Sequence, residues 1–536
     1  MARRGVASIQ EALVGIDRIA NGVVWRSDGA ACAVLEVAPL TFDLLPEAEQ
    51  RAVLAGFGAF LNALTHPIQI LVRVARLDLE PYLADLTERA RREPAAALAD
   101  LAHDHVAALR DLAASRLLLD RHFYLVIPDE DLAGPRPPRR FPRPRREGAP
   151  AAEEPARRRL AFRCEEAVTR LGRCRLRAWR LDDTALARLY RDCWHQDEPG
   201  DRGVRDIATY TGLTAARAGR HAPAHPPARE ETPGPLAEPG AADGVAPDVP
   251  AHQGRPRRWW RRRPAGRVPT APEDGRHPDS VRFAEGARAV ADYIAPEAVE
   301  IDREWLRLNR VYGRTLAVTN LPPALEAGWL QLLTGGDEPL TVSLHVRPLD
   351  TTRMIRDLQR RAVQIQSSQL ADERAGKLDD PARRIAFEQI EALRDALQRG
   401  DERLFSVGLY LFLAAPSPRA LDDRTARVEH LLEGALAQSR RATFEQDSGF
   451  RACLPLADDR LRRPRNLETG SVGLLIAFCD SCLTMGRGPV YGLTPEGHGL
   501  ALLDRHGLDL PNGNTFVCAK AGAGKSFFVK VAALRG

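Results

Sequence analysis

The chain has 536 residues, enough for about two to four domains, and its hydrophobic content of 44% is ordinary for globular protein. Its 77 basic and 72 acidic residues nearly balance, so net charge alone gives no reason to expect nucleic acid or a membrane as partner. Eight scattered cysteines form no disulfide framework, and no stretch has the roughly 18 apolar residues of a membrane span. These features predict a cytoplasmic protein.

The N-terminal block reads as one sheet covered by helices. Residues 22–37 alternate like two strands around the turn signal Ser27-Asp28-Gly29, and residues 46–65 have the spacing of an amphipathic helix. A strand over 68–74, helices within 80–120 and a strand over 123–127 follow. This order predicts an α+β layer domain.

Two segments interrupt this pattern. Residues 133–158 interleave prolines with arginines and predict a disordered insertion, after which a helix near 157–172, a strand at 175–181 and a helix at 183–194 resume the fold. Residues 216–281 are rich in Pro, Ala, Gly, Glu and Arg and predict a flexible linker.

The linker contains the run Arg257 to Arg263, in which arginines flank two tryptophans. Basic residues interleaved with aromatic rings could bind single-stranded DNA or an anionic membrane surface. The alternative is a linker segment without a ligand.

The second block, from residue 282, repeats the rhythm of the first. We expect strands at 315–318, 342–346, 404–415 and 441–446, with helices at 322–334 and 419–438 and two long helices over 351–399 broken near Asp379. The two blocks therefore read as related α/β units on either side of the linker.

A lone Cys479-x-x-Cys482 pair is the remaining cysteine motif. Because neither a second pair nor spaced histidines accompany it, we expect ordinary packing rather than a zinc site.

The strongest chemical signal lies near residue 520. Residues 514–519 read as a buried strand, a small-residue turn follows, and Gly524-Lys525-Ser526 opens a helix. A strand, glycine-rich turn, Gly-Lys-Ser and helix form the phosphate-binding loop of nucleoside triphosphatases. Three of only four lysines lie at 520–530 in a chain whose other basic residues are all arginine, so lysine is retained where a compact charge is needed.

Each residue of the loop has a physical role. Small side chains let the backbone amides converge on phosphate oxygens, and the following helix directs its positive end at them. Lys525 would neutralise the β- and γ-phosphates, and the Ser526 hydroxyl would bind Mg²⁺. The expected nucleotide contacts are Ala519, Lys520, Ala521, Gly522, Ala523, Gly524, Lys525, Ser526 and Phe527, with ATP and Mg²⁺ as cofactors.

The loop and its surroundings resemble the conjugative-transfer ATPases of type IV secretion systems (the VirB-four/TraC class). The resemblance rests on Asn512-x-Asn514 before the loop, Gly488 to Gly492 and Leu502 to Arg505 as an introducing hairpin, and Phe57 to Gln69 in the first block. Ala519 stands where the motif has its first glycine.

This resemblance implies an α/β fold in which α+β N-terminal domains precede a RecA-like nucleotide domain. The expected organisation is an α+β domain at 1–132, an insertion at 133–158, its continuation at 159–215, a linker at 216–281, a second α/β domain at 282–485 and the start of the nucleotide domain at 486–536. The acidic strand and water-polarising carboxylate of such ATPases are not found after Ser526, so we expect a truncated chain without catalytic residues of its own.

The resemblance further implies a motor of conjugative DNA transfer or secretion. Such motors work as homo-oligomers, hexamers in the full-length family, at the inner face of the cell membrane, beside the secretion channel components. Two alternatives remain. One is a DNA translocase or helicase of the HerA/FtsK class, which would bind DNA with a steep salt dependence. The other is a docking scaffold without catalysis.

Overall fold

A computed structural model of the chain describes residues 14–130, 150–196, 294–374, 381–480, 488, 490–494, 499–504, 514–520 and 522–535. The chain separates into two units, residues 212–288 and the remainder. The smaller unit, which contains the whole of the expected linker at 216–281 and its Arg257–Arg263 run, lies outside the described residues.

The first half of the larger unit follows the order β-β-β-α-β-α-α-β-α-β-α. Its elements are β1 (Ile16–Ala20), β2 (Val23–Arg26), β3 (Ala31–Val37), α2 (Glu47–Asn62), β4 (Ile68–Arg76), α3 (Glu80–Arg92), α4 (Ala96–Ser115), β5 (Leu119–Pro128), α5 (Pro150–Arg173), β6 (Ala178–Arg180) and α6 (Asp183–Trp194), with a 3₁₀ turn at Phe42–Leu44.

The second half repeats that order element by element. Its elements are β7 (Val299–Ile301), β8 (Leu306–Leu308), β9 (Val311–Asn320), α10 (Gln331–Thr334), β10 (Leu340–Pro348), α11 (Thr351–Arg374), α12 (Pro381–Arg399), β11 (Leu404–Ala415), α13 (Pro418–Gly434), β12 (Gln438–Arg441) and α14 (Gln446–Ala452). The expectation of two related units is therefore met by the topology.

Both halves contribute to one antiparallel sheet. The strands lie in the order β1-β2-β3-β5-β4-β10-β11-β9-β8-β7. This order is symmetric about the β4–β10 pair when each strand is matched with its counterpart in the other half. The short strands β6 and β12 are also counterparts, because they pair with the equivalent strands β3 and β9. The halves meet where β4 pairs with β10, for example at Ile70 opposite Leu344. The duplicated units thus share a continuous backbone hydrogen-bond ladder, and the expected α/β class is confirmed.

The sheet is buried on both faces. Along β11, Phe405, Val407, Leu409, Leu411 and Leu413 point into one core, which includes residues of α2, α5 and α13. The intervening Tyr410, Phe412 and Ala414 point into a second core, with residues of α6 and α14. Because successive side chains of a strand alternate between faces, a strand covered on both sides is apolar throughout.

Two helix starts follow directly from sequence. Asp182 precedes α6, and its carboxylate accepts a hydrogen bond from the backbone N–H of Ala185 at 2.8 Å. Ser417 caps α13 in the same way, with Pro418 as the first helical residue. Such caps satisfy backbone donors that the first turn leaves without partners.

Three sequence expectations were wrong in extent. The helix expected over 322–334 is reduced to α10, because Gly328 adopts a positive φ of 76° that a helix cannot contain. The strand expected over 441–446 ends at Arg441, shortly before Phe444 turns to a φ of 65°. The insertion expected to run to residue 158 ends earlier, because Pro150 begins α5. Residues 131–149 lie outside the described part.

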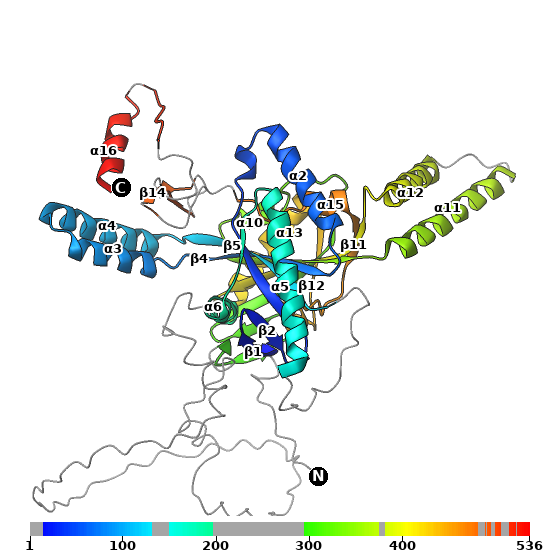
Figure 1. Cartoon of the computed structure of the whole chain (residues 1–536), viewed down its shortest axis with the longest axis horizontal. Coiled ribbons are helices and arrows are strands. Elements are labelled where there is room, and N and C mark those ends of the chain that lie inside the picture. The colour runs from blue at the N-terminus through cyan, green and yellow to red at the C-terminus, as the bar shows by residue number, and fades with distance from the viewer. Residues whose placement is uncertain are drawn as a thin grey trace, which may run out of the picture. The chain divides into compact units, whose positions relative to one another are not determined.

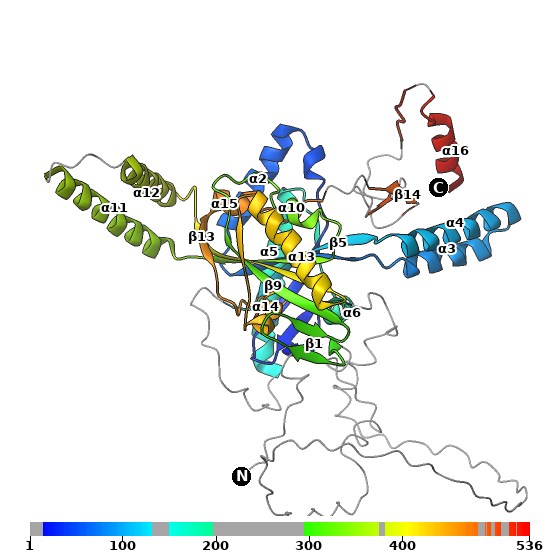
Figure 2. The same ribbon diagram turned by 180° about the vertical axis from the view of Figure 1, so that it is seen from behind.

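Each half inserts a pair of helices between neighbouring strands, as Figures 1 and 2 show. Arm A (α3 and α4, residues 80–115) connects β4 to β5, and arm B (α11 and α12, residues 351–399) connects β10 to β11. After α14 the chain adds β13 (Arg465–Glu468), α15 (Thr469–Leu474), the hairpin of β14 (Val490–Leu493) and β15 (Leu500–Leu502), and α16 (Lys525–Arg535). Among the described helices, none combines the length and the apolar character that crossing a bilayer requires.

Candidate functional site

The glycine-rich turn before α16 has the backbone of a tight loop. Gly522 and Gly524 adopt positive φ angles of 76° and 84°, and nothing lies within 4 Å of a Cβ placed at either residue. The amide of Ala523 donates to the carbonyl of Lys520 at 3.3 Å, and the first helical hydrogen bond runs from Phe528 to Gly524. Since side chains disfavour these φ angles, the turn requires glycine for its conformation rather than for lack of space.

Lys525 is the first residue of α16, and its side chain folds back over the loop. Its Nζ donates to the carbonyl oxygens of Ala519 at 2.5 Å and of Lys520 at 3.0 Å. Within the described residues no carboxylate lies within ion-pair distance of this ammonium group. The loop therefore holds a positive charge at the N-terminus of a helix with neutral partners only, an arrangement that favours an anion.

Two of the expected nucleotide contacts, Ser526 and Phe527, directly follow Lys525. Ser526, the second residue of α16, and Phe527 are exposed, with Phe527 at 74%. A hydroxyl in this place is accessible to a cation that bridges phosphates. The chemistry of the donors fits Mg²⁺, which retains several waters and takes few protein ligands. Ala521 lies outside the described residues.

The strand expected at 514–519 was wrong. These residues form no strand in the structure, and the Phe516 side chain is 92% exposed. A strand needs hydrogen-bonded neighbours, and none of the described strands pairs with this segment. The helix after the loop is confirmed as α16.

Aromatic packing connects the loop region to the preceding hairpin. The rings of Tyr491 on β14 and Phe528 on α16 lie 6.0 Å apart. The other face of the hairpin packs on arm A, where Val490, Leu500 and Leu502 share an apolar cluster with Leu83 of α3 and Leu109 of α4. Nothing in the sequence pattern indicated this contact, because the hairpin and arm A are far apart along the chain.

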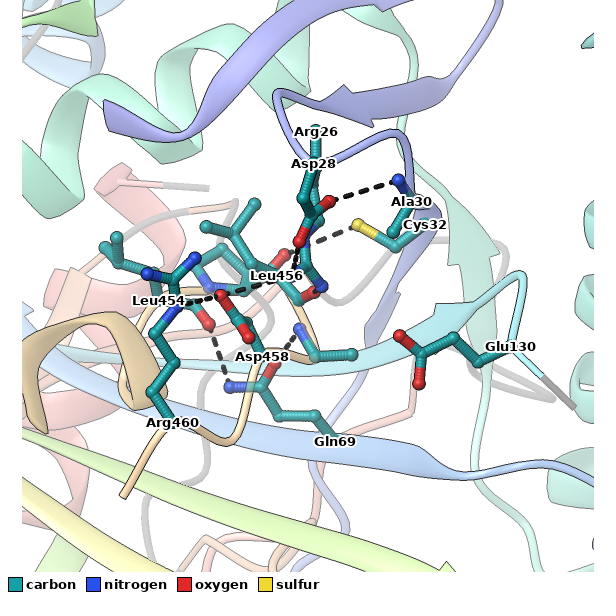
Figure 3. A network of polar contacts seen from close by, with 12 residues as sticks. Arg26, Asp28, Ala30, Cys32, Gln69, Glu130, Leu454, Leu456, Asp458 and Arg460 are labelled. Atoms are coloured by element: carbon teal, nitrogen blue, oxygen red, sulfur yellow. Dashed lines mark hydrogen bonds and ion pairs between the residues drawn. The ribbon is translucent and has the colours of Figure 1, made fainter. Parts of the chain in front are cut away.

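A buried polar network connects the two halves on one face of the sheet (Figure 3). Its centre is the strap, the irregular segment at residues 453–463 that follows α14. Gln69 of β4, which is fully buried, donates to the Leu454 carbonyl at 2.9 Å and accepts from the Ala457 amide at 2.7 Å. The Gln69 side-chain amide also donates to Ser343 Oγ at 2.9 Å, so one side chain joins both halves and the strap.

Arg26 of β2 holds the far end of the strap. Its guanidinium donates to the Leu456 carbonyl at 3.0 Å and pairs with Asp28 at 2.5 Å and Asp458 at 3.1 Å. Burial alone would lower the pKa of Arg26, but the two carboxylates outweigh it and raise the pKa above its ordinary value. For the adjacent Cys32 thiol, burial has the opposite effect and raises the pKa to about 12, so this cysteine stays protonated at neutral pH. These contacts of Arg26 hold the strap against β2.

Cys479, the described member of the Cys-x-x-Cys pair, is buried in the first core, and burial raises the pKa of its thiol to about 12. Cys482 lies outside the described residues.

Comparison with known proteins finds a similarity in the first repeat of the chain. Residues 17–195 match the family model of an archaeal TraC-like domain. This range coincides with the first repeat, from β1 to α6, and supports a relation to a TraC-like, conjugation-related family over about a third of the chain. No curated protein matches the chain.

Proposed function

We propose that the chain is the N-terminal portion of an ATP-binding motor of conjugative DNA transfer or type IV secretion, and that the loop from Ala519 to Phe527 binds Mg²⁺–ATP. The observation that carries the proposal is the position of Lys525 at the head of a helix, with its ammonium over a turn of two left-handed glycines. The TraC-like match of residues 17–195 supports the transfer context independently.

Each part of the loop would contact a different part of the bound Mg²⁺–ATP. The amides from Gly522 onward would converge on the phosphates, as in other anion-binding nests. Lys525 would exchange its two carbonyl partners for the β- and γ-phosphate oxygens, and Ser526 would bind Mg²⁺. When bound, Mg²⁺ neutralises charge that develops on the phosphates. The proposal includes self-association at the inner membrane face beside the secretion channel components.

The test is binding of a fluorescent ATP analogue to the full chain in the presence of Mg²⁺, with unlabelled ATP as competitor. Loss of a charge-assisted contact of about 1.5–3 kcal/mol predicts roughly 10- to 100-fold weaker binding for Lys525→Ala. Lys530→Ala is the matched control, because Lys530 is an exposed lysine of the same helix, one turn beyond the loop. Equal affinities for both variants and the unaltered chain would remove the proposal's basis.

If the chain is instead a HerA/FtsK-class translocase, we expect it to bind DNA with an affinity that falls steeply as the salt concentration rises. A docking scaffold predicts association with channel components that Lys525→Ala leaves unchanged. Both readouts can be taken on the same two lysine variants.

A further inference from the structure

The two helical arms are topological equivalents with different surfaces. Both leave the sheet between neighbouring strands of their half, and apolar residues occupy matching places on them. Leu101 lies fourteen residues before the end of α4 at Ser115, and Ile385 lies fourteen residues before the end of α12 at Arg399. Both side chains are exposed, at 40% and 51%.

More apolar surface surrounds each of these residues. On α4, Leu98 lies one turn before Leu101 and is 43% exposed. On α11, Val363 and Leu370 are 59% and 49% exposed and lie seven residues apart, so they share one face of the helix. Arg383 of α12 donates a hydrogen bond to Ser368 Oγ of α11, so the nearby Ile385 lies along arm B at about the height of Val363 and Leu370. Large apolar side chains gathered in this way on paired helices are typical of an interaction surface.

The arms carry opposite net charges. Residues 80–115 contain seven acidic and four basic residues, a net charge of −3. Residues 351–399 contain eight acidic and ten basic residues, a net charge of +2. Two copies of the same arm would repel each other, whereas arm A and arm B attract.

The base of arm A is already covered. Leu83 and Leu109 pack against the β14–β15 hairpin of the same chain, so the exposed side chains of arm A lie nearer its tip. The contact available to another molecule is therefore the outer part of α4, beyond the hairpin.

We propose that arm A of one copy of this chain docks on arm B of a second copy, through the exposed apolar side chains of both arms. Because the two surfaces differ, the contact is heterologous: each copy uses arm A toward one neighbour and arm B toward the other. Repetition produces a ring if the rotation closes and an open chain if it does not. The contact uses no residue of the glycine-rich loop, so it is independent of nucleotide binding.

The test is sedimentation of the full chain over a range of concentrations at low and at moderate salt. The unaltered protein is expected to exceed the monomer mass of 59.0 kDa, more strongly at low salt because salt screens the charge attraction. Leu101→Asp and Ile385→Asp should each weaken association at least tenfold. Leu44→Asp is the control, since Leu44 is 71% exposed and lies outside both arms.

Mixing the two arm variants identifies the kind of contact. The Leu101→Asp copy retains arm B and the Ile385→Asp copy retains arm A, so the mixture should form a dimer and nothing larger. A monomeric unaltered chain would overturn the proposal. Self-association of either variant at the unaltered strength would also overturn it, because a contact between identical arms does not need both surfaces.

Discussion

Gln69 is the residue whose replacement tests the connection of the two halves most clearly. It is fully buried, and its amide contacts Ser343, Ala452, Leu454 and Ala457. We consider Gln69→Leu, which keeps the approximate volume but removes every hydrogen bond. The loss of stability depends on which of these four partners keep another hydrogen bond.

Most of the partners have a second contact. The Ala452 carbonyl also accepts from Ser343 Oγ at 2.7 Å, and the Leu454 carbonyl accepts from the Leu456 amide at 2.7 Å. The Ala457 amide has Gln69 as its only partner among the contacts of the described residues. The Ala457 amide is partly buried, so leaving it without a partner costs at most about 1–3 kcal/mol, and the net loss of the hydrogen bonds from Gln69 to the two carbonyls adds about 1 kcal/mol. We therefore expect Gln69→Leu to lower the free energy of unfolding by about 2–4 kcal/mol.

Urea unfolding gives the change in free energy, and amide hydrogen exchange shows where it arises. The Ala457 amide should exchange slowly in the unaltered chain and much faster in Gln69→Leu. Ser343→Ala is the matched comparison, expected at about 1 kcal/mol, because the Ala452 carbonyl keeps its contact with His345. A Gln69→Leu effect no larger than that of Ser343→Ala, with unchanged exchange at Ala457, would refute the reasoning.

The remaining predictions concern a histidine and a pair of glycines. His122, whose side chain is 39% exposed, lies between Asp120 at 3.2 Å and Glu36 at 3.6 Å. Burial alone would lower its pKa, but the carboxylates raise it to about 10, so its stabilisation is complete below about pH 6.5 and is lost as the pH rises toward 10. Unfolding free energies of the unaltered chain and His122→Gln should therefore converge between pH 6.5 and 10, and a constant difference would contradict the pairing. A Cβ on Gly449 would lie 2.6 Å from Thr315 Cβ, whereas nothing lies within 4 Å of one on Gly434. We expect Gly449→Ala to destabilise by about 1–3 kcal/mol and Gly434→Ala to be neutral or stabilising, as thermal unfolding would show; equal effects would argue against the packing.

Local pattern predicted much of this fold. The alternation from Leu404 to Ala415 gave β11 with its observed ends, and the break expected near Asp379 lies just before α12, which begins at Pro381. The turn signal at Asp28 gave the β2–β3 hairpin. These elements were accessible because their periodicity, caps and turns are encoded within a few residues.

What sequence reasoning missed depends on distant contacts. Gln69 is a polar residue in a mostly apolar strand, and only the folded structure shows that it contacts a segment nearly 400 residues away. The strand expected at Phe516 failed because strand formation needs a neighbour, which a local pattern cannot supply. In the loop, the positions of Gly522, Gly524 and Lys525 followed from the motif, whereas the packing of the hairpin on arm A did not.

Amide hydrogen exchange of residues 519–527, with and without Mg²⁺–ATP, tests the central claim most directly. If the loop binds the phosphates, the amides of Gly522 to Ser526 should exchange more slowly with nucleotide in the unaltered chain, and Lys525→Ala should need about 10- to 100-fold more nucleotide for the same slowing. Exchange that ATP leaves unaltered in this segment, at nucleotide concentrations up to the millimolar range, would contradict the assignment of the loop as a nucleotide site.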